Sequence, residues 1–172
     1  VLSDPDYQWI EVDSVLYPVD DVVIAKADGT KICCQCKKNQ VNFKQWTVAD
    51  LGDELEKASS LLANNKTAEV RFYSRSPFSA LAKLREYAAT QSSEKNYRTK
   101  FSKEHQKIDA ALLTKISTQA PNLSTYEFLC RTTFVTSDEF DRMVTLLHER
   151  LRSLVCNPKF AYNALWTRID QL

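Results

Sequence analysis

The spacing of apolar residues predicts short strands in the first half of the chain. Apolar and polar side chains alternate over Tyr7–Val15 and Thr67–Ser74, as in a β-strand with two different faces. Between these segments, Asp28-Gly29 separates two more strand-like stretches and is a strong hairpin signal. We therefore predict a β-hairpin formed by Asp20–Ala27 and Thr30–Lys38, with one further strand on either side of it along the chain.

Helical spacing dominates the rest of the chain. Thr47-Val48-Ala49-Asp50 has the form of a capping box, and apolar residues recur behind it every three or four positions. Two more helical regions follow, around residues 77–90 and 93–118, and Tyr126–Val135 is predicted to be a strand. The most regular amphipathic helix begins at Phe140, and a last helix follows Asn157-Pro158. This order predicts an α/β fold in which helices flank a mixed sheet, with extra helices at the C-terminal end.

Composition narrows the functional classes. The chain has 172 residues, 44% hydrophobic and 26% charged, which suits a single globular domain. Its formal net charge of +1 means that any DNA-binding surface must be a local patch. Only two glycines are present, which argues against a glycine-rich phosphate-binding loop.

The cysteines and the chain ends indicate the compartment. Five cysteines are an odd number, and three of them crowd positions 33–36, unlike a secreted disulfide scaffold. The sequence contains neither a signal peptide nor an apolar run of about 18 residues. We therefore expect a cytoplasmic protein that does not enter a membrane. Because the sequence lacks an initiator Met, we also expect a fragment of a larger protein.

The hairpin carries the residues with the clearest chemistry. Gln35 and Lys37 are two positions apart, so they share one face of their strand, and we expect Ile32, Cys34 and Cys36 to face the core on the other side. Asp21 begins the partner strand. The register stays open: a two-residue turn would set Asp20 opposite Lys37, and a three-residue turn would set Asp21 there.

These residue types suit a metal-dependent phosphodiesterase. Mg²⁺ or Mn²⁺ prefers oxygen ligands, which Asp21, the side-chain carbonyl of Gln35 and the backbone carbonyl of Cys36 could supply. Lys37, on the same face as Gln35, could hold the attacking water or a phosphate oxygen.

The same residues resemble a known superfamily. Asp21-Val22-Val23-Ile24, Asp28-Gly29 and Gln35-Cys36-Lys37, followed by Trp46-Thr47 and a helix, are similar to the PD-(D/E)xK restriction-endonuclease-like superfamily. The similarity is greatest to the double-stranded DNA endonuclease domains at the N-termini of bacterial antiphage effectors. It covers about residues 9–90. It implies a single restriction-endonuclease-like domain with its core at about 7–90 and a C-terminal strand and helical part at about 91–172.

The resemblance also implies roles and partners. Asp21 becomes the metal-binding acid, Gln35 takes the place of the usual Glu or Asp, and Lys37 becomes the catalytic lysine. The family's N-terminal helix often carries another acid, and Glu11 is the nearest candidate to replace it. The implied partners are double-stranded DNA, a C-terminal sensor or NTPase domain of the same protein, and further copies in a homo-oligomer.

Simpler interpretations remain beside these. The Asp21, Gln35 and Lys37 side chains could form an ordinary polar sheet face, or belong to an inactive nuclease fold that serves DNA or protein binding and assembly. The chain could also be a structural assembly domain that dimerises through the amphipathic helices after residue 136. The clustered cysteines are more typical of core packing than of a zinc site, because adjacent positions point to opposite faces. A basic stretch with interleaved aromatics could contact DNA or form a solvated helix face. The candidate DNA-contacting residues are Arg71, Arg75, Lys100 and Lys103.

Overall fold

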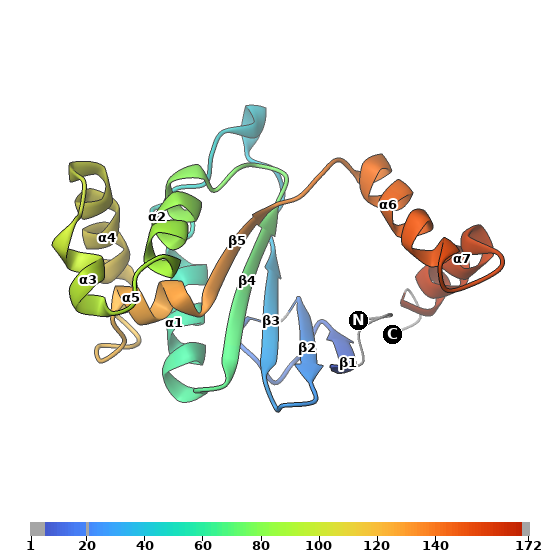
Figure 1. Cartoon of the computed structure of the whole chain (residues 1–172), viewed down its shortest axis with the longest axis horizontal. Helices are drawn as coiled ribbons and strands as arrows, with labels where there is room; N and C mark the ends of the chain where they lie inside the picture. Colours follow the sequence, from blue (N-terminus) through green and yellow to red (C-terminus); the bar gives the residue numbers. More distant parts are fainter. Residues whose placement is uncertain (1–5, 20, 170–172) are drawn as a thin grey trace.

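A five-stranded mixed sheet forms the centre of the molecule (Figure 1). The fold is seen in a computed structural model, which describes residues 6–19 and 21–169. Strands β1, β2 and β3 are antiparallel neighbours, while β4 and β5 continue the sheet parallel to β3. The strands lie in sequence order: β1 (Tyr7–Val12), β2 (Val22–Lys26), β3 (Lys31–Cys36), β4 (Ala68–Ser74) and β5 (Thr132–Thr136).

Helices cover one face of this sheet. The connection from β3 to β4 and that from β4 to β5 advance in the same direction, so right-handed crossovers put their helices on the same face. The first connection contains a 3₁₀ turn (Val41–Phe43) and α1 (Gly52–Asn64). The second contains α2 (Ser79–Ala89), α3 (Glu94–Thr99), α4 (Lys103–Ile116) and α5 (Thr125–Cys130).

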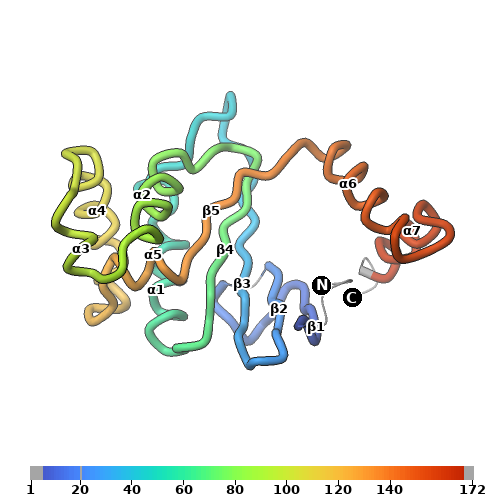
Figure 2. The backbone as a smooth tube through the Cα atoms, in the orientation of Figure 1, coloured from blue at the N-terminus to red at the C-terminus, as the bar shows by residue number. Residues whose placement is uncertain are grey.

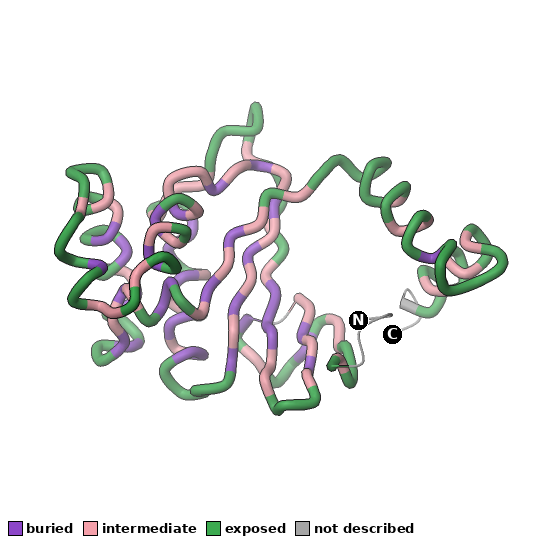
Figure 3. Tube along the Cα trace, viewed as in Figure 1, coloured by how far each residue is buried: buried purple, intermediate pink, exposed green. Residues whose placement is uncertain are grey.

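The main hydrophobic core lies between this sheet face and the helices. Phe72 of β4 and Phe134 of β5 stack with their ring centroids 5.3 Å apart, and Phe78 packs against Phe134 at 5.6 Å. Leu55 of α1 and Leu84 of α2 are fully buried in the same cluster. The tube coloured by burial shows this band of buried residues running through the sheet and the adjoining helices (Figure 3).

The last two helices form a helical hairpin apart from the sheet. Helices α6 (Phe140–Arg152) and α7 (Pro158–Ile169) pack against each other, with the His148 and Tyr162 rings 4.9 Å apart. The backbone trace shows them on the far side of the sheet from α3 and α4 (Figure 2). The predicted α/β class, mixed sheet and extra C-terminal helices are all confirmed.

One predicted strand is wrong over half its length. Residues 126–130 of the segment Tyr126–Val135 belong to α5 (Thr125–Cys130), and β5 starts only at Thr132. The Ser124 hydroxyl accepts a hydrogen bond from the Glu127 N–H and thereby caps α5. This Ser-x-x-Glu pattern favours a helix start, which outweighs the β-propensity of the aromatic residues. At the other end of the sheet, β1 ends at Val12, before the positive φ of 52° at Asp13.

The described helices also bear on membrane insertion. Over residues 6–19 and 21–169, no helix is both long enough and apolar enough to cross a bilayer.

Candidate functional site

The hairpin turn sets the register of the site. The Lys26 N–H donates to the Thr30 carbonyl at 2.9 Å, so the loop is Ala27-Asp28-Gly29, with Gly29 at a φ of 86°. Val22 then lies opposite Cys34, and one step further Asp21 lies opposite Gln35. The expectation that a three-residue turn sets Asp21 opposite Lys37 is therefore wrong by two residues, because the loop begins one residue earlier than that pairing requires.

The face that carries Gln35 is also the face of the main core. Gln35 is paired with Phe72, and Cys33 on the same face is fully buried in the core cluster. The expectation that Ile32, Cys34 and Cys36 face the main core is therefore wrong. Ile32 and Cys34 are also buried, but on the opposite face. Alternation cannot separate the two faces here, because β3 is the central strand and both of its sides are shielded.

Asp21 is held by two donors from β3. Its Oδ2 atom accepts a hydrogen bond from Gln35 Nε2 at 2.6 Å and a second from the backbone N–H of Cys36. The N–H and C=O of one strand residue point to the same side, so the Cys36 carbonyl also faces the β2 side. Asp21, Gln35 and Cys36 thus meet where the hairpin ends.

Lys37 makes an ion pair with Glu54, a residue that the sequence analysis missed. Glu54 lies in the first turn of α1, and the two side chains are only 22% and 21% exposed. The Lys37 ammonium also lies 5.9 Å from the ring centre of Trp46. Trp46 is an anchor: it packs against the core and donates from Nε1 to Ser74 at 3.0 Å.

The Glu54 carboxyl is ionised more easily than an isolated one. Burial raises its pKa, but the hydrogen bond and charge of Lys37 outweigh burial, so the pKa lies below its ordinary value. A signal for Glu54 does exist in the sequence. It lies three residues after Leu51 and four before Ala58, so it interrupts the apolar stripe of α1 with an acid.

Within the described part of the chain, Glu11, Arg71 and Arg75 form no hydrogen bond or ion pair with Asp21, Gln35 or Lys37. Glu11 lies opposite Val23, on the Asp21 face but further along the hairpin. Arg71 is paired with Cys34 and therefore lies on the opposite face, 3.5 Å from Glu69. Arg75 follows the end of β4, where it lies 3.6 Å from Glu139 and stacks over Phe43.

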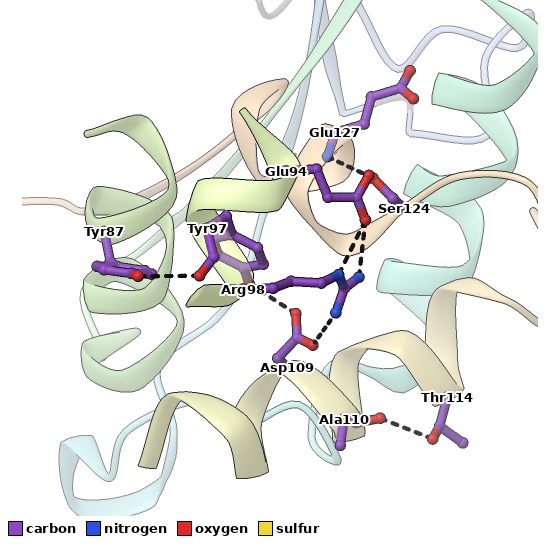
Figure 4. A network of polar contacts seen from close by, with 9 residues as sticks. All are labelled: Tyr87, Glu94, Tyr97, Arg98, Asp109, Ala110, Thr114, Ser124 and Glu127. Atoms are coloured by element: carbon purple, nitrogen blue, oxygen red, sulfur yellow. Dashed lines mark hydrogen bonds and ion pairs between the residues drawn. The ribbon is translucent and has the colours of Figure 1, made fainter. Parts of the chain in front are cut away.

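Lys100 and Lys103 lie in the helical part formed by α3 and α4, at the left end of the view in Figure 1, with β4 and β5 between it and the hairpin strands β2 and β3. The aromatics of this basic stretch, Tyr97 and Phe101, pack into or against the core. Tyr97 is fully buried and donates its hydroxyl to Asp109 at 2.8 Å, and Arg98 joins Asp109 to Glu94 (Figure 4). Burial, together with the neighbouring Asp109 carboxylate, raises the pKa of Tyr97. Tyr97 therefore ties α3 to α4 and offers no surface on which bases could stack.

The donors at the hairpin suit a hard cation better than zinc. Asp21 and Glu54 offer carboxylates, and Gln35 and Cys36 offer carbonyl oxygens, the ligands that Mg²⁺ and Mn²⁺ prefer. Across the described part of the chain, no three His, Cys, Asp or Glu side chains gather into a group that could hold a metal. Any cation here would therefore keep several waters.

Two of the three clustered cysteines behave as core residues, whereas the third, Cys36, is exposed. Cys33 and Cys34 are both buried, and as adjacent strand residues they point to opposite faces. Burial raises the pKa of Cys33 to about 11 and that of Cys34 to about 12, so both thiols stay protonated at neutral pH. Protonated thiols on opposite faces do not form a zinc site.

Comparison with known proteins adds no identity. The chain matches no protein-family model, and neither a curated protein nor a solved structure matches it.

Proposed function

We propose that this chain is a metal-dependent endonuclease domain of the PD-(D/E)xK restriction-endonuclease-like class, acting on double-stranded DNA. One observation supports this most directly: Asp21 and Gln35 are hydrogen bonded at 2.6 Å, and Lys37 follows on the same face in contact with Glu54. An acid and an amide thus pair at the end of the hairpin, and a lysine two residues further along the same face pairs with a second acid from α1. The mixed sheet flanked by helices agrees with the fold expected for that class.

The roles follow from the functional groups. A bound Mg²⁺ or Mn²⁺ would stabilise negative charge on the phosphate and lower the pKa of a water. Asp21 and Glu54 would hold that cation with their carboxylates, aided by the oxygens of Gln35 and Cys36. Lys37 would donate to the attacking water or to a phosphate oxygen and so offset the charge that develops as the phosphorus–oxygen bond breaks.

The ion pair between Lys37 and Glu54 sets a condition on this scheme. Glu54 cannot give its carboxylate fully to a cation while Lys37 holds it. We expect cation binding to draw Glu54 away from Lys37, which frees the ammonium for the phosphate. Both side chains are about one-fifth exposed, so solvent and ions reach them.

The wider setting is proposed from the motif alone. Its likeness to the effector domains of bacterial antiphage proteins supports a cytoplasmic defence protein with a C-terminal sensor or NTPase domain. In such a protein, homo-oligomerisation would bring two copies of the Asp21–Lys37 site together on one duplex. Two sites side by side would cut both strands.

Plasmid cleavage tests the proposal. Supercoiled plasmid is incubated with Mg²⁺ or Mn²⁺ and either the wild-type chain, the Lys37→Ala variant or the Lys38→Ala variant. Lys38 is the adjacent exposed lysine, so its variant carries the same change in net charge. We expect metal-dependent nicking by the wild type and by Lys38→Ala, with a loss of about 100-fold or more in Lys37→Ala. Equal cleavage by the two variants would contradict the assignment.

A second candidate function, binding without cleavage, is favoured because the polar groups of the site are already paired with each other. Asp21 is paired with Gln35 and Cys36, and Lys37 with Glu54, so these polar groups satisfy each other without a ligand. That is compatible with an inactive nuclease fold that binds DNA or protein. Fluorescence anisotropy with a labelled duplex distinguishes the two: binding by the wild type with no cleavage, even when the chain is forced to oligomerise by fusion, would favour the inactive module.

A further inference from the structure

Helices α1 to α5 cover only one of the two faces of the sheet. Because both crossovers lie on the Gln35 side, helices α1 to α5 do not cover the opposite face, although Ile32 and Cys34 at its centre are buried. We call this the open sheet face. Ile10 on it is 49% exposed, and further apolar side chains on it are only partly buried. The latter are Val22, Ile24, Tyr73 and Val135.

The C-terminal helices carry a second apolar surface. Phe140 is 54% exposed, Met143 40% and Leu146 47% on α6, and Phe160 and Trp166 on α7 are 71% and 50% exposed. Helices α6 and α7 form a helical hairpin, and we call its exposed apolar surface the hairpin face. It includes a concavity of 680 Å³ lined by Met143, Leu146, Leu147, Glu149 and Arg150. Large exposed apolar side chains gathered on one short segment mark a surface that packs against a partner.

The segment between β5 and α6 directs the helical hairpin away from the sheet of its own chain. The Ser137 N–H donates to the Ser74 carbonyl at 2.8 Å, so the chain stays paired to β4 one residue beyond β5. Glu139 then lies 3.6 Å from Arg75, and Asp138 lies 3.5 Å from Arg142. Figure 1 shows the result, with α6 leading outward from the end of β5. The two apolar surfaces therefore stay apart within one chain.

The hairpin face and the open sheet face have similar dimensions. Helix α6 has 13 residues and is therefore about 20 Å long, and two adjacent helices are about 20 Å wide. Four strands of the sheet span about 20 Å, and β4, with 7 residues, is about 23 Å long. The hairpin face and the open sheet face thus have the same footprint, about 400 Å².

We propose that a second copy of this chain covers the open sheet face with its α6–α7 hairpin, and that the exchange is reciprocal. A two-fold dimer of this kind makes the contact twice, and each contact buries both surfaces, for a total of about 1,600 Å². That is the size of a standard stable protein interface. Reciprocal exchange also closes the assembly at two copies, because no hairpin or sheet face is left over. The inference is independent of the proposed nuclease activity.

Sedimentation velocity tests the dimer, over a range of concentrations of the 172-residue chain. We expect the wild type to be a dimer at micromolar concentration. Met143→Glu with Leu146→Glu should weaken association by about 100-fold or more, because the charges would be buried in the contact. Thr145→Glu is the matched control, because Thr145 is an exposed residue on the other side of α6. It should leave the dimer intact.

A complementation experiment tests which surfaces meet. Ile24→Lys places a charge on the apolar open sheet face, so this variant alone should also be monomeric. A mixture of the Ile24→Lys chain, fluorescently labelled, with the Met143→Glu, Leu146→Glu chain retains one intact contact, so heterodimers should form. Near-UV circular dichroism confirms that each variant is folded.

Three results would overturn the proposal. A wild type that stays monomeric at all concentrations would mean that the hairpin closes on its own sheet or remains uncovered. An Ile24→Lys variant that still dimerises would show that hairpin faces pair with each other. A mixture that forms no heterodimer would exclude exchange between the hairpin face and the open sheet face.

Discussion

Replacing Glu54 by Gln tests the contact between α1 and the end of the hairpin. The substitution keeps the size and one carbonyl oxygen of the side chain but removes its charge. Lys37 then faces a neutral amide at a position where it is only 22% exposed. The variant therefore isolates the electrostatic part of the ion pair.

The magnitude follows from the partial burial of both partners. Fully exposed ion pairs contribute about 0.2–1 kcal/mol, whereas breaking a buried pair costs about 3–5 kcal/mol. Side chains that are 21% and 22% exposed lie between these limits, and the amide oxygen keeps some of the contact. We expect the variant to lose about 1 kcal/mol in the free energy of unfolding at pH 7, or about 2–4 °C in Tm.

The pH dependence has a definite sign. Because Lys37 keeps the pKa of folded Glu54 below the ordinary 4.5, the unfolded chain binds a proton at Glu54 before the folded chain does. The stabilisation by Glu54 is therefore complete above about pH 5.5 and is lost as the pH falls through the pKa of the folded state. The stability difference between wild type and variant should shrink over that window.

Urea unfolding at a series of pH values from 7 to 3, followed by circular dichroism, measures this difference. Asp53→Asn is the matched control, because Asp53 is the preceding residue in the first turn of α1 and is exposed. It should change stability by less than about 0.5 kcal/mol. A Glu54→Gln variant as stable as the wild type at pH 7, or a difference that does not change with pH, would refute the reasoning.

Three further predictions concern Asp21, Tyr97 and the cysteines. Asp21→Asn should weaken Mn²⁺ binding by about 10-fold or more in calorimetry, because it removes an anionic ligand while an amide can still contact Gln35; unchanged affinity would place the cation elsewhere. Tyr97→Phe should cost about 1.5–3 kcal/mol in urea unfolding, because it removes a hydrogen bond to the buried Asp109 carboxylate, and it should leave DNA affinity unchanged. If Tyr97→Phe bound DNA more weakly, the basic stretch around Tyr97 would have to contact DNA after all. Iodoacetamide on the native protein at pH 8 should modify the exposed thiols long before the buried Cys33 and Cys34, and mass spectrometry would detect rapid labelling of either buried residue as a contradiction. The exposed thiols are Cys36, Cys130 and Cys156.

Local signals predicted the hairpin and most of the helices. Asp28-Gly29 fixes a turn by its own backbone preferences, and the Asp28 carboxylate accepts from the Thr30 N–H at 2.8 Å to close it. Thr47 and Asp50 also exchange the hydrogen bonds of a capping box, with the Thr47 N–H donating to Asp50 Oδ2 at 2.9 Å, but they close a turn before the helix, because α1 begins at Gly52 with Leu51 as its N-cap. Both features involve residues at most three positions apart, so a sequence pattern contains all the information that they need.

The remaining errors concern contacts between distant elements. Which side of β3 meets the main core depends on the handedness of two crossovers, and no single strand records that choice. The register error came from a shift of one residue in the loop, which moved Asp21 from Lys37 to Gln35. Glu54 joins the site through α1, which begins well after the hairpin ends. Only the position of Glu54 on an apolar helix stripe could have revealed it.

The separation of β4 from β5 along the chain has a consequence for folding. The two strands are neighbours in the sheet, yet α2, α3, α4 and α5 all lie between them in sequence. The β2–β3 hairpin closes a short loop in microseconds, whereas β5 can pair only after this long helical excursion has been ordered. As an edge strand that docks late, β5 should open before the centre of the sheet, and its amide hydrogens should exchange with solvent sooner than those of β3. Each such opening would expose the Phe72 ring that Phe134 covers, so the stacked pair marks the boundary between the early and late folding parts of the sheet.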